Sequence, residues 1–147
     1  MYRKILAVTF GTELSNRAVT AAAQIAKGLG ASLLLLHVRS PMDIPHHPEG
    51  GVLSSPARET ITEEINEEER KLLAGAVDIA ASFGMQAETA FIADILASDA
   101  IVRVSREQQC DLIVMATRIR HGIPGYFVKS ETQKVLEHTD TPVLVVR

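Results

Sequence analysis

The stretch "DLIVMATRIRHGIPGYFVKSETQKVL", residues 111–136, decides the fold class. Its first six residues, 111–116, form a run that is apolar on both faces of a strand, which is typical of a central strand in a parallel sheet. A loop is predicted over 117–127, and a helix over 128–138 follows it. In a parallel α/β protein, such a junction between a strand and a helix is where phosphates are usually held.

Strand-like and helix-like segments alternate along the rest of the chain. Short runs of β-branched and other apolar residues predict strands at 4–10, 31–38, 86–92 and 141–147. Apolar residues that recur every three or four positions predict helices at 12–30, 56–83 and 95–109. This alternation implies right-handed crossovers, and it predicts a single-domain three-layer α/β sandwich with a parallel sheet and helices on both faces.

Capping and turn residues indicate where several elements begin and end. Thr12 is expected to be the N-cap of the first helix, and Gly30 stands where a left-handed C-terminal residue is expected. Pro56 suits the first position of the long helix, and Gly84 ends that helix. The segment 39–56 contains four prolines and two glycines, so a surface loop is predicted there.

The parallel sheet also predicts where a ligand would bind. Ligands of such sheets lie beyond the carboxyl ends of the strands, at the point where the strand order reverses. The loops at that edge are predicted at 9–12, 39–56, 93–97 and 116–130.

Composition and charge exclude several classes of function. The chain has 147 residues, which suits one domain over 1–147. A net charge of −3 and the lack of a basic tract argue against nucleic acid and a membrane surface as partners. The apolar runs are far shorter than the roughly 20 residues that span a bilayer. The one cysteine, Cys110, cannot form an internal disulfide, so a cytoplasmic location is expected.

A few residue types invite a chemical interpretation that their spacing does not support. The neighbours His46 and His47, with Glu49, would point apart in an extended chain and lack further ligands at helical spacing, so no metal site is predicted. His37 is expected to be a hydrogen-bonded structural residue at a strand end, and Cys110 a small apolar filler.

No catalytic constellation is predicted. Asp94 and Asp99 do not form a persuasive catalytic pair, and Asp99 is interpreted as a first-turn charge or a solvent-facing residue. A nucleophile-elbow motif is lacking, so Ser-His-Asp chemistry has no support in the sequence.

Three parts of the chain resemble a known family. They are the opening "MYRKILAV", "GTELSNRAV" and "AAQIAKGLGASLLLLHV", then "CDLIVMATR", and finally "HTDTPVLVVR". Over its full length the chain resembles the universal stress protein family. The resemblance implies a five-stranded parallel sheet in the order 3-2-1-4-5. It also implies a cytoplasmic location, a role in stress resistance and, as in many members, a homodimer.

Many members of that family bind ATP through a pattern of Gly, two residues, Gly, nine residues and then Gly-Ser or Gly-Thr. On this chain the three glycines fall at Ala116, Ile119 and Lys129, and only the hydroxyl of Ser130 is kept. Phe10 stands where ATP-binding members have an aspartate near the end of the first strand. The stretch "IADILASD" replaces a Gly-Asp-Pro-like segment before the third helix. All of these departures fall where the nucleotide would lie.

The departures count against phosphate binding. Ile119 is β-branched and resists the positive φ that phosphate-holding loops use. Lys129 opposes the helix dipole by roughly a few tenths of a kcal/mol, unless an anion bridges the two. Phe10 removes an acceptor, and its ring could plug the site. We therefore expect no cofactor, with ATP or AMP as the alternative.

Two interpretations of the loop after residue 116 stay open. In the first, the loop is a surface connection in which "HGIPG" supplies turn chemistry. In the second, a residual site for a nucleotide or another anion draws on Thr9, Thr12, Ala116, Arg118, Arg120, Lys129 and Ser130.

The last strand is expected to form an interface. It is almost wholly apolar, and the topology puts it at a sheet edge; its residues are Pro142, Val143, Leu144, Val145 and Val146. An exposed apolar edge invites pairing with another chain. We therefore expect a homodimer through this strand, and the alternative is a monomer whose edge is covered by a loop.

The sequence favours a small cytoplasmic stress-response protein, which acts as a dimeric binding or regulatory module without turnover and has a degenerate nucleotide site. The alternative is an ATP- or AMP-binding member with slow hydrolysis or nucleotide-gated signalling. A hydrolase or transferase on the same scaffold has no residue at a strand end to support it.

Overall fold

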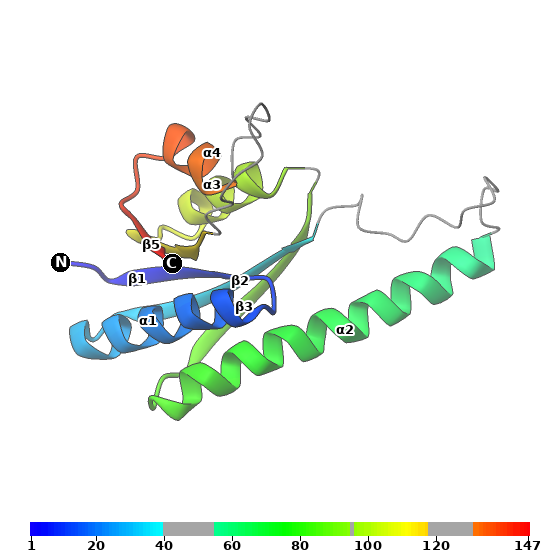
Figure 1. Cartoon of the computed structure of the whole chain (residues 1–147), viewed down its shortest axis with the longest axis horizontal. Helices are drawn as coiled ribbons and strands as arrows, with labels where there is room; N and C mark the ends of the chain where they lie inside the picture. The colour runs from blue at the N-terminus through cyan, green and yellow to red at the C-terminus, as the bar shows by residue number, and fades with distance from the viewer. Residues whose placement is uncertain (40–54, 95, 118–130) are drawn as a thin grey trace.

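The computed structural model describes residues 1–39, 55–94, 96–117 and 131–147, and over 55–66 it describes the backbone alone. Strands and helices alternate along these residues (Figure 1). They are β1 Lys4–Thr9, α1 Glu13–Leu29, β2 Ser32–Arg39, α2 Ser55–Ser82, β3 Ala87–Ala93, α3 Ala97–Glu107, β4 Leu112–Ala116, α4 Glu131–His138 and β5 Val143–Val146. The order of strands and helices is the one that the sequence predicts.

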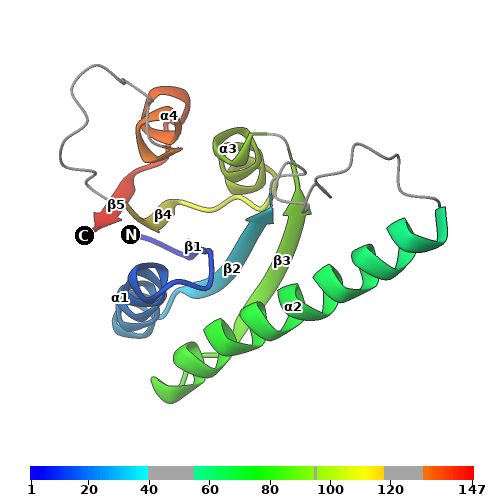
Figure 2. The same cartoon turned by 45° about the vertical axis from the view of Figure 1, so that its right-hand side comes forward.

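The five strands form one parallel sheet in the order β3-β2-β1-β4-β5. This order confirms the one implied by the family resemblance. Its central strand β1 pairs with β4 on one side and with β2 on the other, from Lys4↔Ser32 to Thr9↔His37. Helices α1 and α2 cover one face, and α3 and α4 cover the other (Figures 1 and 2).

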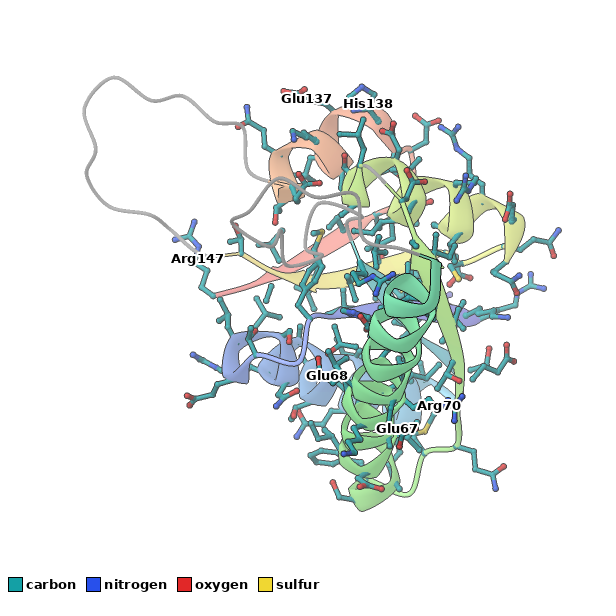
Figure 3. All side chains as sticks on the ribbon, turned by 90° about the vertical axis from the view of Figure 1, so that its right-hand side faces the viewer. Glu67, Glu68, Arg70, Glu137, His138 and Arg147 are labelled. Atoms are coloured by element: carbon teal, nitrogen blue, oxygen red, sulfur yellow. The ribbon has the colours of Figure 1, made fainter. Side chains whose placement is uncertain are left out.

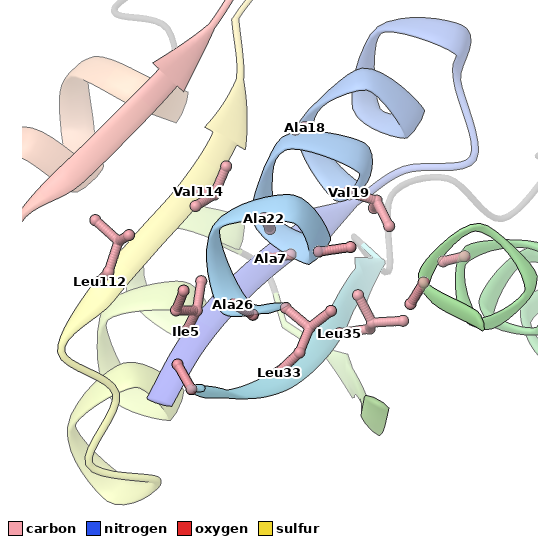
Figure 4. Packing of buried hydrophobic residues seen from close by; sticks show 14 residues of the cluster. Ile5, Ala7, Ala18, Val19, Ala22, Ala26, Leu33, Leu35, Leu112 and Val114 are labelled. Carbon is pink, nitrogen blue, oxygen red and sulfur yellow. The ribbon is translucent and has the colours of Figure 1, made fainter. Parts of the chain in front are cut away.

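Small residues pack α1 against the sheet. Ala18, Ala22 and Ala26 recur along one side of the helix and are fully buried. Figure 4 shows them beside strand residues that include Ile5 and Leu33. Because alanine lets the helix backbone approach closely, the larger strand side chains are removed from water, and each contributes roughly 1.5–3 kcal/mol.

A second core lies on the opposite face of the sheet. It joins the central strands to α3 and α4 through Leu6, Val8, Leu34, Leu36, Ile101, Val104, Ile113, Met115 and Val135. Successive side chains of a strand point to opposite faces, so a strand buried on both sides must be apolar at every position. The prediction of such a strand at 111–116 is confirmed for residues 112–116, because Leu112 to Met115 are all buried, while Asp111 lies before the strand.

Helix α1 begins and ends as predicted. Thr12 is its N-cap, and the Thr12 Oγ1 accepts a hydrogen bond from the Ser15 N–H at 3.1 Å. Gly30 is its C-cap, with a φ of 65°. Both ends therefore follow from local residue chemistry.

Most predicted boundaries differ from the observed ones by one or two residues, and two of the differences have a clear local cause. The strand β1 ends before Phe10, because the Phe10 N–H donates to the Ser15 Oγ (3.2 Å) and not to the sheet. The helix α3 ends at Glu107, since the chain turns at Gln109, whose φ is 54°. Positive φ is incompatible with a continuing right-handed helix.

Both ends of the loop predicted at 39–56 belong to regular elements instead. Arg39 is the last residue of β2, and Ser55 and Pro56 begin α2. Residues 40–54 lie outside the described part of the chain, as does the start of the helix predicted at 128–138.

Helix α2 has 28 residues and extends past the carboxyl ends of the strands (Figures 1 and 2). Its second half packs on the sheet through Ala76 and Ala80. The outer surface is charged, and Glu67 and Arg70 form an exposed ion pair there at 3.5 Å (Figure 3). Among the helices of the described residues, none has both the length and the apolar character that crossing a bilayer requires.

Candidate functional site

The loop after β1 lies at the carboxyl edge of the sheet and is closed by its own hydroxyl groups. Thr9 is fully buried, and its Oγ1 accepts a hydrogen bond from the Gly11 N–H at 3.3 Å. The Ser15 Oγ accepts from the N–H groups of Phe10 (3.2 Å) and Thr12 (3.0 Å). Three consecutive amides that could face a ligand are thus donors to groups inside the protein.

The Ser15 hydroxyl ties this loop to α1. Besides accepting from the two amides, it donates to the Thr12 carbonyl oxygen at 3.0 Å and lies 3.5 Å from the Thr9 Oγ1. Thr12 and Ser15 form a reciprocal capping box, which satisfies N–H groups that a helix N-terminus otherwise offers to anions. Little hydrogen-bonding capacity therefore remains here for a phosphate.

Gly11 brings the same loop against α2. Its φ is +72°, and a Cβ at this position would lie 2.7 Å from the Leu72 Cδ1. This conformation is readily adopted only by glycine. The loop is therefore held from one side by α1 and from the other by α2.

The Phe10 side chain occupies the position that the family resemblance gives to an aspartate. Its ring is 38% exposed and meets the His37 ring edge-on, with the centroids 6.2 Å apart and the planes at 76°. An aromatic ring accepts no strong hydrogen bond, so this position cannot hold a ribose hydroxyl or a metal-bound phosphate as a carboxylate could.

A buried ion pair joins β2 to α2. The His37 Nδ1 lies 2.7 Å from the Thr9 carbonyl oxygen, and the His37 Nε2 contacts the Glu69 Oε2. A carbonyl oxygen only accepts, so Nδ1 carries a hydrogen. Both side chains are buried, and their contact links the end of β2 to α2.

Two further side chains complete the cluster at the ends of β2 and β3. The Phe91 ring stacks near the His37 ring, with the centroids 5.8 Å apart and the planes at 21°. The Arg39 Cζ lies 5.9 Å from the Phe91 centroid. We call Phe10, His37, Arg39, Glu69 and Phe91 the edge cluster.

The residues predicted for a residual site are only partly described. Thr9 and Thr12 lie together at the Ser15 hydroxyl, and their own hydroxyls are engaged within the loop. Ala116 ends the neighbouring strand β4, so the topology brings it to the same edge. The remaining predicted residues, Arg118, Arg120, Lys129 and Ser130, lie outside the described residues, as does Ile119.

Sequence reasoning identified His37 but missed its partner. The prediction of a hydrogen-bonded strand-end histidine is confirmed by the bond to Thr9. The acidic run "EEINEEER", residues 63–70, predicts that its acids lie on the solvent face of the helix, and for Glu69 this is wrong, because its side chain is buried. The signal was present in the sequence: Glu69 lies four residues after Ile65 and three before Leu72, on the apolar stripe of the helix.

The other candidates for chemistry have structural roles. The Asp94 carboxylate accepts from the Leu96 N–H (3.3 Å) and pairs with Arg103 (3.3 Å). Asp99 lies in the first turn of α3, as predicted. Cys110 is buried, and this burial raises the pKa of its thiol above the ordinary value. The apolar-filler interpretation fits a thiol that resists ionisation.

Metal-ligand types do not gather in the described part of the chain. No group of three His, Cys, Asp or Glu side chains able to hold an ion is found among those residues. His46, His47 and Glu49 lie outside them. His138 (Figure 3) ends α4, with its Nδ1 2.7 Å from the Lys134 carbonyl oxygen.

Comparison with known proteins agrees with this fold. The model of the universal stress protein family matches residues 1–147. Universal stress protein YxiE of Bacillus subtilis is 31% identical over 149 residues, and the alignment covers 100% of both chains.

Two solved structures are similar in fold. One is a universal stress protein in complex with cAMP, with a TM-score of 0.73, 24% identity and coverage of 99% of this chain and 97% of that chain. The other is the universal stress protein of Archaeoglobus fulgidus in complex with dAMP, with a TM-score of 0.67, 22% identity and coverage of 100% and 98%. With its whole length matched by the family model, this chain belongs to the universal stress protein family.

Proposed function

We propose that this protein is a dimeric stress-response module that binds or regulates without turnover, and that its adenylate site is degenerate. The observation that carries the proposal is the closed loop after β1, where the N–H groups of Phe10, Gly11 and Thr12 all donate to internal hydroxyls. Phosphate binding at a strand-to-helix junction depends on amides that are free to face the ligand. Its cytoplasmic location stays a prediction from the sequence.

Side-chain bulk supports the same conclusion. The Phe10 ring lies over His37 at the edge where a nucleotide would approach β1. In the sequence, Ile119 and Lys129 replace two of the three glycines of the family's ATP pattern, and Ala116 replaces the third. Each replacement adds a Cβ where a backbone must come close to phosphate.

Calorimetric titration with ATP and AMP tests the proposal, with a restored variant as the positive control. This variant carries Phe10→Asp, Ala116→Gly, Ile119→Gly and Lys129→Gly. We expect no heat of binding at micromolar wild-type protein and measurable binding by the variant, after thermal unfolding shows that both are folded. Micromolar affinity in the wild type would contradict the degenerate site. A variant that folds but does not bind would contradict the steric explanation, but it would not contradict the degenerate site itself.

A second candidate function is nucleotide binding, with slow hydrolysis or nucleotide-gated signalling. It is favoured by the two structural neighbours, which were solved in complex with cAMP and dAMP. The same titration, repeated with these two nucleotides, separates the candidates. Binding of a mononucleotide without ATP would favour a site that keeps the base pocket and has lost the triphosphate loop.

Dimerisation through β5 is part of the proposal. The strand β5 is an edge of the sheet, and its outer side has no pairing strand among the described residues. Leu144 on this strand is 38% exposed, and Leu136 on the neighbouring α4 is 51% exposed. Antiparallel pairing of two β5 strands across a two-fold axis would cover this edge.

A further inference from the structure

We propose that Arg39 and the edge cluster form a binding site for a small anion, a carboxylate or a phosphate, at the carboxyl ends of β2 and β3. The site adjoins the adenylate site considered above, which the family pattern puts at the ends of β1 and β4, and the two share Phe10. The proposal of an anion site does not depend on whether a nucleotide binds at the adenylate site.

The Arg39 guanidinium is incompletely satisfied. Its Nε and Nη1 are both buried, and neither has a hydrogen-bond partner among the described residues. Buried polar atoms are almost always hydrogen-bonded, and arginine is rarely buried unless it is paired. A guanidinium with two unsatisfied N–H groups is suited to donate hydrogen bonds to an acceptor on a bound ligand.

Among the described side chains, neither Glu69 nor Asp94 forms an ion pair with Arg39. The Glu69 Oε2 contacts the His37 Nε2, although no hydrogen bond satisfies that oxygen. Asp94, whose N–H donates to the Arg39 carbonyl oxygen at 3.0 Å, directs its carboxylate to Arg103 and to the Leu96 N–H. The Arg39 guanidinium is charged, because arginine stays protonated in proteins, and it has no paired carboxylate among the described side chains.

The register of the sheet puts Arg39 on the α2 side. Side chains of a strand alternate between the two faces, and His37, which meets α2, lies two residues before Arg39. Phe91 pairs in register with His37, so it shares that face. The guanidinium thus lies beside the Phe91 ring, where a charge-assisted hydrogen bond is screened less than in open water.

The test measures the thermal stability of three proteins with and without anions. Wild type, Arg39→Met and Arg103→Met are unfolded in chloride, in inorganic phosphate and in acetate at one ionic strength. Arg103 is the matched control, because it is an exposed arginine that is already paired with Asp94.

We expect phosphate, acetate or both to raise the Tm of wild type and Arg103→Met equally, and to leave Arg39→Met unchanged. In calorimetry, the affinity of Arg39→Met for the stabilising anion should fall at least about tenfold, as expected when one charged contact is lost. In chloride alone, Arg39→Met should be as stable as wild type or more stable, because an unpaired buried group is removed.

Two results would overturn the proposal. The first is an anion response that survives in Arg39→Met, and the second is a marked loss of stability by that variant in chloride, which would make Arg39 a structural residue. If the variant fails to fold, the test is the NMR resonance of the Arg39 Nε–H in the wild type, which is followed while phosphate or acetate is added. A shift that saturates with phosphate or acetate supports the site, and no shift refutes it.

Discussion

Gly11 illustrates how one residue can fix the loop at the candidate site. Its φ of +72° costs a residue with a side chain about 1–2 kcal/mol, and a Cβ would also press on Leu72. We predict that Gly11→Ala lowers the free energy of unfolding by about 2 kcal/mol, measured by urea denaturation. Gly28→Ala is the control, since Gly28 lies in α1 with nothing within 4 Å of an added Cβ. It should stabilise by roughly 0.5–1 kcal/mol. Equal effects of the two substitutions would contradict this account.

Cys110 gives a prediction that depends on pH. Burial is the main cause that raises the pKa of its thiol, so the folded protein keeps this proton at a pH where the unfolded chain loses it. Stability from this residue is thus complete below the ordinary thiol pKa and falls as the pH rises above it.

The measurement for Cys110 compares unfolding free energies of wild type and Cys110→Ala from pH 7 upward. We expect the unfolding free energy of the wild type to fall relative to that of Cys110→Ala as the pH rises. The thiol should also react slowly with an aromatic disulfide reagent until urea unfolds the protein. Rapid labelling of the folded protein would show that the thiol is not buried.

Among the elements, α2 depends on the His37–Glu69 pair for its contact with the end of β2. We predict that Glu69→Ala lowers the unfolding free energy by about 3 kcal/mol, because it leaves a buried imidazole without its partner. Glu67→Ala is the matched control two residues earlier. Its pair with Arg70 is exposed, so the loss should be about 0–1 kcal/mol. Similar losses of unfolding free energy in both variants would show that the buried pair stabilises the protein no more than the exposed pair does.

The type and order of every element could be predicted from the sequence, because periodicity reports local burial. Boundaries were less predictable where side chains from elsewhere intervene. Phe10 is not part of β1, because its N–H donates a hydrogen bond to the Ser15 hydroxyl of α1. The pairing of His37 with Glu69 could not be found by spacing, since the two residues lie on different elements and only the packing of α2 on β2 brings them together.

For the molecule as a whole, the fold was more predictable than the site. The alternation of apolar strands and amphipathic helices predicts the layers, and the family resemblance supplied the strand order that the structure confirms. The site depends on which side chains engage the loop amides and on residues 118–130, which lie outside the described part of the chain. The sequence could show which glycines are missing, but not that Thr9 and Ser15 occupy the amides.

Assembly is also a property of the whole molecule. We predict that wild type sediments as a dimer and that Val145→Lys sediments as a monomer, because a lysine on an edge strand opposes strand pairing. Leu29→Lys is the control, as Leu29 is 46% exposed at the end of α1. It should leave the sedimentation coefficient unchanged. A wild-type dimer that survives Val145→Lys would rule out pairing through β5.

The central claim is that the carboxyl edge of this sheet has no room and too few free amides for an adenine nucleotide at the ends of β1 and β4. The most direct measurement is to purify the protein without added nucleotide, denature it, and analyse the supernatant for adenylates by absorbance and chromatography. The account predicts none above the background of a mock preparation. An adenine nucleotide released in a fixed ratio to the protein would contradict it.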